Sequence, residues 1–377
     1  MDFDAEFAAA VADQRADRLE PAEQAYRAIV ARKEHAPSLH NLGVILEDSG
    51  RLAEAALAFE RAAAAAPDNP ERLLILAEHY RLARRFAEGE PVYRRVLALA
   101  PDNDEAAHDL GLLLLATGRY AEGWALCERR VTRQRFLQQT LSFPEWRGEP
   151  LSGKRLFVWR EQGFGDQIMM ARFLSKLPAA QITYAGPAPL ERLFKALPVD
   201  FMTFTEGALP IPRHDYWILP MSLPGRLWIT GHNMPAEPYF FGCAKVVGGR
   251  IGVVWRGAPA NANDRYRALP PDLAAELLTL PGAISLDPAD TGAADFQATA
   301  DIIAGLDLVI TVDTAVAHLA GAMGRPVWVL LARSAIDWQW PREGASPWYP
   351  TARFFTQPTS GDWGSVIADV LRALAVI

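Results

Sequence analysis

The sequence predicts two kinds of structure in one chain: an N-terminal solenoid of helix pairs, followed by two doubly wound α/β domains. The solenoid is indicated by residues that recur every 34 positions before residue 130. The α/β part is indicated by short apolar strands that alternate with helices from residue 151 onward, without the polar alternation of a half-exposed sheet. A chain of 377 residues is long enough for two or three such domains.

The composition excludes several function classes. Lys and Arg number 38 against 45 Asp and Glu, and the net charge of -7 disfavours a general nucleic-acid-binding role. Cys127 and Cys243 are the only thiols, too few for a disulfide framework or a cysteine-ligated metal. The acidic start and the lack of a long apolar run favour a cytoplasmic protein without membrane insertion.

The periodic part predicts three helix pairs. Small residues recur where two helices must approach closely, and large apolar residues recur where a helix fills its neighbour's groove. The matching positions are Leu42, Leu76 and Leu110; Gly43, Ala77 and Gly111; Ala55, Gly89 and Gly123; and Phe59, Tyr93 and Cys127. The pattern resembles the tetratricopeptide repeat, and we assign residues 1–135 to it. Leu19–Ile29 is interpreted as the second helix of a degenerate earlier pair.

The repeat predicts a binding role. A short stack of helix pairs exposes a concave groove that usually holds a peptide or protein. The alternative is that the stack only dimerises the chain or braces the next domain.

A connecting arm at 136–150 leads into the two α/β halves. The first half is expected at 151–245 and the second at 246–360, with a closing helix at 361–377. The expected strands are Leu156–Trp159, Ile182–Tyr184, Met202–Phe204, Tyr216–Leu219, Arg250–Trp255, Ala283–Leu286, Leu308–Thr311 and Pro326–Leu331. Because ligands bind outside the carboxyl ends of such strands, we expect the site in the crevice between the halves.

One strand-to-helix junction predicts an anion site. A buried strand ends at Thr311, and Asp313 or Thr314 is expected to cap the helix that follows. Free N–H groups at that helix start, including the N–H of Ala315, favour phosphate, and the Thr314 hydroxyl adds a donor. His318 lies one turn further, within reach of the same diphosphate. The alternative is a histidine that is hydrogen-bonded inside the helix packing.

A glycine loop precedes the first helix of the α/β part. In Glu161-Gln-Gly-Phe-Gly-Asp166, the glycines at 163 and 165 let the backbone turn against a ligand. Asp166 could accept a proton from an attacking hydroxyl, or it could simply cap the helix. Spacing alone favours capping.

A segment rich in arginine begins at Trp255, directly after the first strand of the second half. It carries Arg256, Arg265 and Arg267 toward the crevice, where they could stabilise a departing diphosphate, although exposed arginines are often only solvated. The aromatic residues Trp338, Trp340, Trp348 and Tyr349 could stack on a base or sugar, or could pack internally. Asp287 and Asp290 are not expected to bind a metal, since no third ligand is near in sequence.

Taken together, these motifs resemble those of bacterial tetratricopeptide-repeat glycosyltransferases, whose catalytic half is similar to the heptosyltransferases and, more distantly, to the O-linked N-acetylglucosamine transferases. The resemblance implies a GT-B fold, a nucleotide-sugar donor, no metal or other cofactor, and inversion at the anomeric carbon. It implies that Asp166 is the general base and that Asp313, Thr314 and His318 belong to the donor-phosphate motif. It places Arg265 or Arg267 where a heptosyltransferase has a donor-binding lysine. The chain departs from the pattern after Leu286, where the usual Gln and glycine are missing.

The sequence therefore predicts a transferase that moves a sugar to an acceptor hydroxyl, such as a Ser or Thr of a flagellar or surface protein held by the repeat groove. The alternatives are a nucleotide-sugar epimerase, a transferase acting on a glycan or lipid, and a non-catalytic adaptor; a homodimer is possible. The catalytic candidate is Asp166. The expected donor contacts are Gly165, Gln167, Trp255, Arg256, Arg265, Arg267, Asp313, Thr314, Ala315 and His318.

Overall fold

The computed structural model forms two compact units, Met1–Leu113 and Leu114–Ile377. It describes residues 3–137, 141–178, 181–204, 211–244, 250–257, 264–333, 336–341 and 344–376, apart from the side chain of Arg265. The predicted boundary between the α/β halves, at 245–246, lies outside the described residues.

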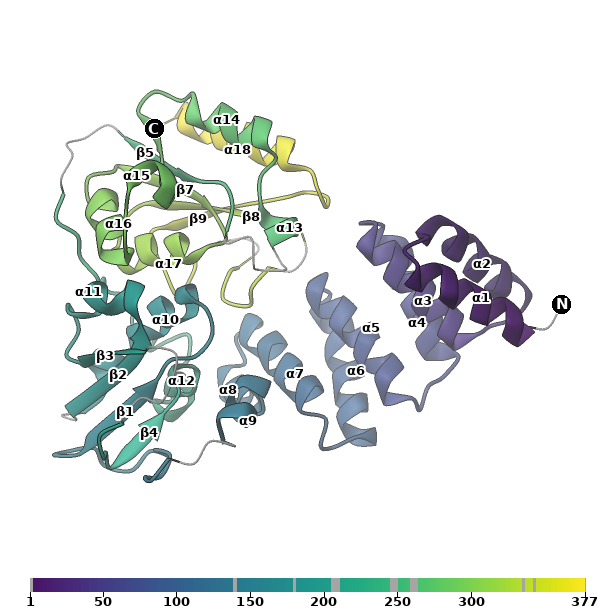
Figure 1. Cartoon of the computed structure of the whole chain (residues 1–377), viewed down its shortest axis with the longest axis horizontal. Coiled ribbons are helices and arrows are strands. Elements are labelled where there is room, and N and C mark those ends of the chain that lie inside the picture. Colours follow the sequence, from purple (N-terminus) through teal and green to yellow (C-terminus); the bar gives the residue numbers. More distant parts are fainter. Residues whose placement is uncertain are drawn as a thin grey trace. The chain divides into compact units, whose positions relative to one another are not determined.

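The first unit is built from antiparallel helix pairs (Figure 1). Its helices are α1 (Phe3–Arg15), α2 (Leu19–Arg32), α3 (Ala36–Asp48), α4 (Leu52–Ala64), α5 (Pro70–Leu82), α6 (Phe86–Leu99) and α7 (Asp104–Ala116), the last of which ends in the second unit. The small-residue columns lie where predicted: a β-carbon on Gly43 would stand 2.5 Å from the Phe59 ring, and one on Gly89 would stand 3.2 Å from Tyr80 Cβ. The helices therefore approach as closely as the 34-residue pattern requires.

The Pro-Asp-Asn segments between repeats act as helix starts. Asn69 is the N-cap of α5 and accepts hydrogen bonds from the N–H groups of Glu71 at 3.0 Å and Arg72 at 3.1 Å. Pro70 follows at the first helical position, where its missing N–H costs no hydrogen bond. Asn103 accepts from Ala106 N in the same way before α7. Each segment thus ends one helix pair and begins the next.

The second unit begins with two further helices, α8 (Tyr120–Cys127) and α9 (Val131–Leu137). Trp124 of α8 is buried, and its indole N–H donates to Ile229 O at 3.0 Å. The repeat domain was predicted to end at residue 135, whereas the first compact unit ends at Leu113. The division comes earlier because α8 and α9 pack against the α/β part.

The first α/β half contains one parallel sheet. Its strands follow the order β3-β2-β1-β4, where β1 is Arg155–Trp159, β2 is Gln181–Pro187, β3 is Asp200–Phe204 and β4 is Tyr216–Ile218. The helices of this half are α10 (Phe164–Ala171), α11 (Glu191–Phe194) and α12 (Leu223–Arg226). α10 is the helix that begins at the glycine loop.

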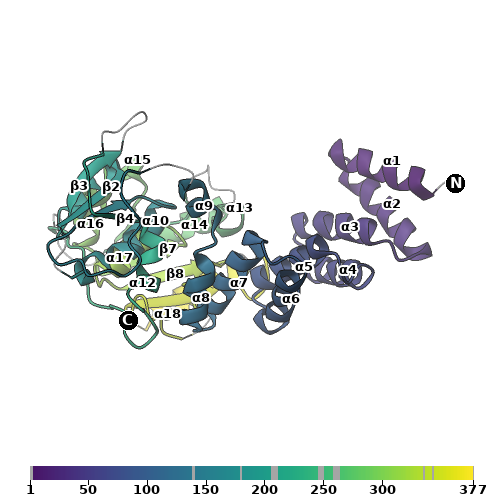
Figure 2. The ribbon, with the colours of Figure 1, turned by 90° about the horizontal axis from the view of Figure 1, so that it is seen from below.

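The second half contains a larger parallel sheet, in the order β6-β5-β7-β8-β9. Its strands are β5 (Ile251–Val254), β6 (Ala283–Ser285), β7 (Leu308–Val312), β8 (Val327–Leu331) and β9 (Ala352–Thr356). Its helices are α13 (Asp264–Arg267), α14 (Pro271–Leu278), α15 (Pro288–Thr291), α16 (Phe296–Ile303), α17 (Ala315–Ala322) and α18 (Trp363–Leu374). α14 and α18 lie side by side over one face of the sheet, and α16 and α17 lie on the other (Figures 1 and 2).

This architecture confirms the predicted fold class of a helical repeat followed by parallel α/β halves. β7 and β8 are buried along their whole length, which explains why their sequences lack polar alternation. Among the described residues, no helix combines the length and the apolar character needed to cross a bilayer.

Candidate active site

The starts of two helices, one from each α/β half, meet at the predicted site. α10 follows β1 through the glycine loop, and α17 follows β7. The contact is made at Gly165, where a β-carbon would stand 2.8 Å from His318 Cδ2 and 3.5 Å from Ala315 Cα. Since both helix starts carry a positive dipole end, this junction favours negative charge.

Asp166 lies in the first turn of α10. Its Oδ2 accepts a hydrogen bond from the N–H of Gly163 at 3.1 Å, which is the capping role that spacing favoured. Burial, reinforced by the nearby charge of Asp337, raises the pKa of Asp166 to about 7. A carboxyl group with that pKa exchanges protons readily at neutral pH, so capping and general-base action are compatible here.

Asp313 follows the end of β7 and is buried. Its Oδ1 accepts a hydrogen bond from the indole N–H of Trp340 at 2.8 Å. Burial, and after it the charge of Asp337, raises the pKa of Asp313 to about 7. The side chain is therefore engaged with Trp340 rather than with the start of α17.

Thr314 is the N-cap residue of α17, but its side chain makes no capping hydrogen bond. Its hydroxyl instead lies 3.0 Å from the hydroxyl of Thr311. Of the two residues predicted to cap this helix, neither does so through its side chain among the described contacts. The first N–H groups of α17, including that of Ala315, are thus left to an anionic ligand.

His318 combines features of both sequence interpretations. It is 4% exposed, its Nδ1 lies 3.0 Å from the Tyr349 hydroxyl, and its ring stacks on Trp340 with centroids 4.8 Å apart. Burial, together with the charge of Arg172, lowers the pKa of His318 to about 3, so the imidazole is neutral. Its other nitrogen, Nε2, is directed toward Gly165 at the helix junction.

A cavity of about 560 Å³ lies beside this junction. Trp255, Arg256, Thr314 and Ala315 line it, four of the residues predicted to contact the donor. The exposed Arg256 guanidinium donates to Asp287 Oδ2 at 3.0 Å. Other lining residues that sequence reasoning did not select are Phe164, Leu286, Asp287, Asp295, Phe296 and Thr299.

The other predicted donor residues whose side chains the structure describes do not line this cavity. Arg267 is paired with Asp264 at 3.2 Å, and its charge lowers the pKa of Asp313. Gln167 is buried; its amide donates to Gly163 O, and its Oε1 accepts from the Tyr184 hydroxyl at 3.1 Å. The side chain of Arg265 lies outside the described residues. The donor-contact assignments of these residues, like those of the other predicted donor residues, stay predictions.

The aromatic segment after β8 packs internally in large part. Trp340, Trp348 and Tyr349 are buried, and Trp338 lies edge-on to Trp124 and Trp348. Arg172, from the end of α10, donates to Trp348 O at 2.7 Å and so ties the two halves together. These contacts fix the position of α10 relative to α17.

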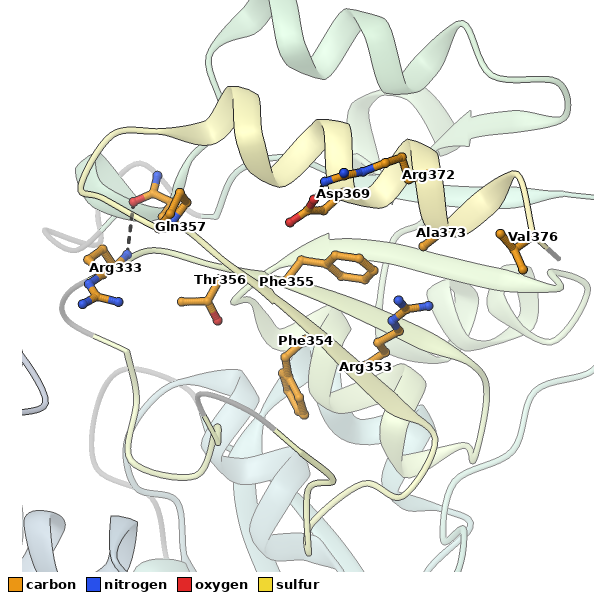
Figure 3. Close-up of a pocket in the computed structure, with 11 residues that line it drawn as sticks. Arg333, Arg353, Phe354, Phe355, Thr356, Gln357, Asp369, Arg372, Ala373 and Val376 are labelled. Carbon is orange, nitrogen blue, oxygen red and sulfur yellow. Dashed lines mark hydrogen bonds and ion pairs between the residues drawn. The ribbon is translucent and has the colours of Figure 1, made fainter.

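A larger cavity, of about 810 Å³, lies between β9 and α18 (Figure 3). Arg333, Arg353 and Arg372 are among its lining residues, and Asp369 pairs with Arg372. None of the predicted donor-site residues whose side chains are described lines it. The junction of α10 and α17 is therefore the stronger candidate site.

Comparisons with known proteins agree with the motifs. Residues 291–337 match the model of glycosyltransferase family 9 (heptosyltransferase), and residues 36–69 and 76–133 match tetratricopeptide repeat models. Protein FlbA from Caulobacter vibrioides is 28% identical in a 326-residue alignment that covers 70% of this chain and 53% of that protein. The chain thus spans about half the length of the curated relative it matches.

Solved structures match parts of both regions. A mutant of the O-GlcNAc transferase from Thermobaculum terrenum aligns with 89% of this chain and 83% of its own, at 15% identity and a TM-score of 0.35. MamA aligns with 37% of this chain and 82% of its own, at 14% identity and a TM-score of 0.34. Residues 291–337 are thus similar to part of a glycosyltransferase family 9 domain, and the helix pairs before them are similar to tetratricopeptide repeats.

Proposed function

We propose that this chain is an inverting glycosyltransferase of the GT-B type, which moves a sugar from a nucleotide-sugar donor to an acceptor hydroxyl without a metal ion. The observation that supports it best is the contact of Gly165, the neighbour of Asp166, with His318 and Ala315 of α17, beside a cavity of about 560 Å³. A base and an anion site are thereby brought to one crevice, which is what transfer from a diphosphate donor requires.

The reaction is an in-line displacement. The acceptor oxygen forms a bond to the anomeric carbon while the bond from that carbon to the diphosphate oxygen breaks. Asp166 takes the proton of the acceptor hydroxyl, and its pKa of about 7 suits that task at neutral pH. Attack on the face opposite the leaving group inverts the anomeric centre.

The departing diphosphate is stabilised by the second half. The N–H groups at the start of α17 and the Arg256 guanidinium take up its negative charge. His318 is neutral, so it contributes one hydrogen bond at most and no charge. The cation therefore comes from arginine and not from an imidazolium.

In this proposal the groove of the repeat region binds the acceptor protein. Repeat models match residues 36–69 and 76–133, and repeats of this kind hold peptides in their groove. The acceptor is then a Ser or Thr hydroxyl of a protein, for example a flagellar or surface protein. Cys127 and Cys243 form no disulfide, which suits a location in the reducing cytoplasm.

Calorimetric titration of the full chain with UDP, GDP, ADP and CMP tests the proposal first. One nucleotide should bind, and the sugar donors carrying that base should then be tested for transfer. Conversion of the donor without any acceptor would favour an epimerase, and transfer to a glycan would replace the protein acceptor. If no nucleotide binds, the chain is an adaptor and the proposal fails.

A further inference from the structure

A buried ion pair joins the last two repeat-region helices to the loop that carries Asp166. Arg130 lies between α8 and α9 and is 2% exposed. Its Nε donates to Glu161 Oε1 at 2.6 Å, and its Nη2 donates to Glu161 Oε2 at 2.8 Å. This is the two-pronged geometry in which a guanidinium fixes both the position and the orientation of a carboxylate.

Other groups complete this contact. Thr132 Oγ1 of α9 donates to Glu161 Oε1 at 2.6 Å, which adds a further hydrogen bond to the same carboxylate. Arg130 Nη2 also donates to Ser222 Oγ at 2.9 Å, and Nη1 donates to Cys127 O at 3.0 Å. The guanidinium is thus bonded to α8, to the glycine loop and to the 3-10 turn before α12.

Only a short stretch of the glycine loop separates the anchored Glu161 from Asp166. Glu161 is its first residue and Asp166 its last. Gln162 adopts a left-handed backbone with φ of 63°, and the N–H of Gly163 is already bonded to Asp166. A loop held in this way has little freedom to absorb a shift of Glu161, and misplacement of a catalytic group by about 1 Å can cost about 100-fold in rate.

We propose that Arg130 and Glu161 are positioning residues, which hold the catalytic loop to α8 and α9 so that Asp166 is aligned only when these helices are in place. The proposal rests on the proposed function, because it takes Asp166 as the base. It assigns the last helices of the repeat region a part in catalysis as well as in binding.

The chain offers a matched control nearby. Arg133 of α9 is also buried, and its Nη2 donates to both oxygens of Glu145, at 2.9 Å and 2.7 Å. Glu145 belongs to the connecting arm and not to the glycine loop. Arg130→Met and Arg133→Met therefore each remove a buried ion pair. Both arginines also pair with Glu128, at 3.2 Å and 3.4 Å, but only Arg130 reaches the glycine loop.

The first experiment compares these two variants in the full chain. For Arg130→Met we expect kcat to fall about 10- to 100-fold with the Kd for the nucleotide diphosphate unchanged. Arg133→Met should keep kcat within about 2-fold. If Arg130→Met does not fold, Thr132→Val replaces it, because that change removes only one hydrogen bond to Glu161. Equal losses of kcat in the loop-linked and control variants would overturn the proposal.

The second experiment uses Glu161→Gln, which preserves the shape but removes the charge. Burial raises the pKa of Asp166 most, and the charges of Asp337 after β8 and Glu161 in its own loop raise it further. Asp313 after β7 has its own pKa raised by burial and also by the charge of Asp166, while His318 on α17 is neutral. Arg267 on α13 acts on Asp313. Removal of the Glu161 charge should move the acidic limb of kcat/KM to lower pH. An unchanged limb would show that the Glu161 carboxylate is not held close to Asp166.

Titration of the Asp166 carboxyl by ¹³C NMR gives the same comparison without turnover, with Asp166→Asn to assign the signal. A downward shift of the Asp166 pKa in Glu161→Gln is expected, and none in Glu145→Gln. This readout separates the two proposals, because it remains available even if the chain transfers no sugar. If the pKa of Asp166 is unchanged in Glu161→Gln, the proposed coupling between the Arg130–Glu161 ion pair and Asp166 is wrong.

Discussion

Gly165 of α10 and His318 of α17 are in direct contact, with no room for a side chain between them. A β-carbon on Gly165 would stand 2.8 Å from His318 Cδ2, and the His318 ring cannot yield because Trp340 and Tyr349 hold it. One glycine therefore sets the separation of the two halves at the proposed site.

Gly165→Ala should destabilise the second unit and impair catalysis together. Overpacking a rigid contact costs about 1–3 kcal/mol, measurable as a lower urea midpoint. Gly163→Ala is the control, since a β-carbon there meets only Asp166 Oδ2, at 3.4 Å. Equal destabilisation by both changes would contradict the tight contact.

Asp166→Asn should lower kcat by about 10² to 10⁴ while the fold and nucleotide affinity persist. In the unmodified chain, activity should rise with pH through about 7, because the pKa of Asp166 is about 7 and the base must be ionised. A rate measured from pH 5 to 9 tests this. Full transfer by a folded Asp166→Asn variant would reject Asp166 as the base.

Asp313→Asn should stabilise the protein above neutral pH. The folded state raises the pKa of Asp313 to about 7, so ionisation costs stability as pH rises from about 4 to about 7. The variant avoids that cost and keeps an oxygen for the Trp340 N–H. Its Tm should exceed that of the parent at pH 8, by about 2–4 °C for each kcal/mol, and should match it at pH 4.

Asp215→Asn provides a control of opposite sign for this pH experiment. The hydrogen bond from the Arg155 N–H lowers the pKa of Asp215, so the ionised form is the favoured one in the fold. Loss of the Asp215 carboxylate should lower the Tm at pH 8 and should change the Tm less at low pH. A Tm gain at pH 8 from both substitutions would contradict the assigned electrostatics.

Arg256→Gln should weaken nucleotide diphosphate binding about 10- to 100-fold, because a charge-assisted hydrogen bond to the leaving group is lost. Arg353→Gln is the comparison. Arg353 is equally exposed, but it lines the other cavity, with its guanidinium 4.8 Å from the Phe355 ring (Figure 3). Calorimetry should show full affinity for this second variant, and a loss there as large as for Arg256→Gln would reject the assigned anion site.

Much of the fold could be predicted because its packing leaves periodic traces. Columns such as Gly43 and Gly89 mark helix contacts, and fully buried strands such as β7 carry continuous apolar runs. β9 was not predicted, because an edge strand is only partly buried and its Ala352–Thr356 sequence mixes polar and aromatic residues. α15 was likewise missed, as one short turn held by the Asp287 cap.

The residues of the site that directly follow a strand could be predicted from the sequence, because the direction of the chain decides where they lie. Asp166 follows the carboxyl end of β1 in the first sheet, and Asp313 and Thr314 follow the carboxyl end of β7 in the second, which is where ligands of such sheets bind. The neutral state of His318 could not be foreseen, because it arises from burial among Trp340 and Tyr349. Nor could the pairing of Arg130 with Glu161, which joins residues 31 positions apart.

That pairing decides where the molecule can be divided. A fragment starting at residue 136, where the 34-residue pattern stops, would omit Arg130 and Thr132 and leave the Glu161 carboxylate without either donor. A fragment starting at Asp104 would retain the complete α7 together with both anchoring helices. The smallest fragment that keeps the proposed site intact therefore includes α8 and α9.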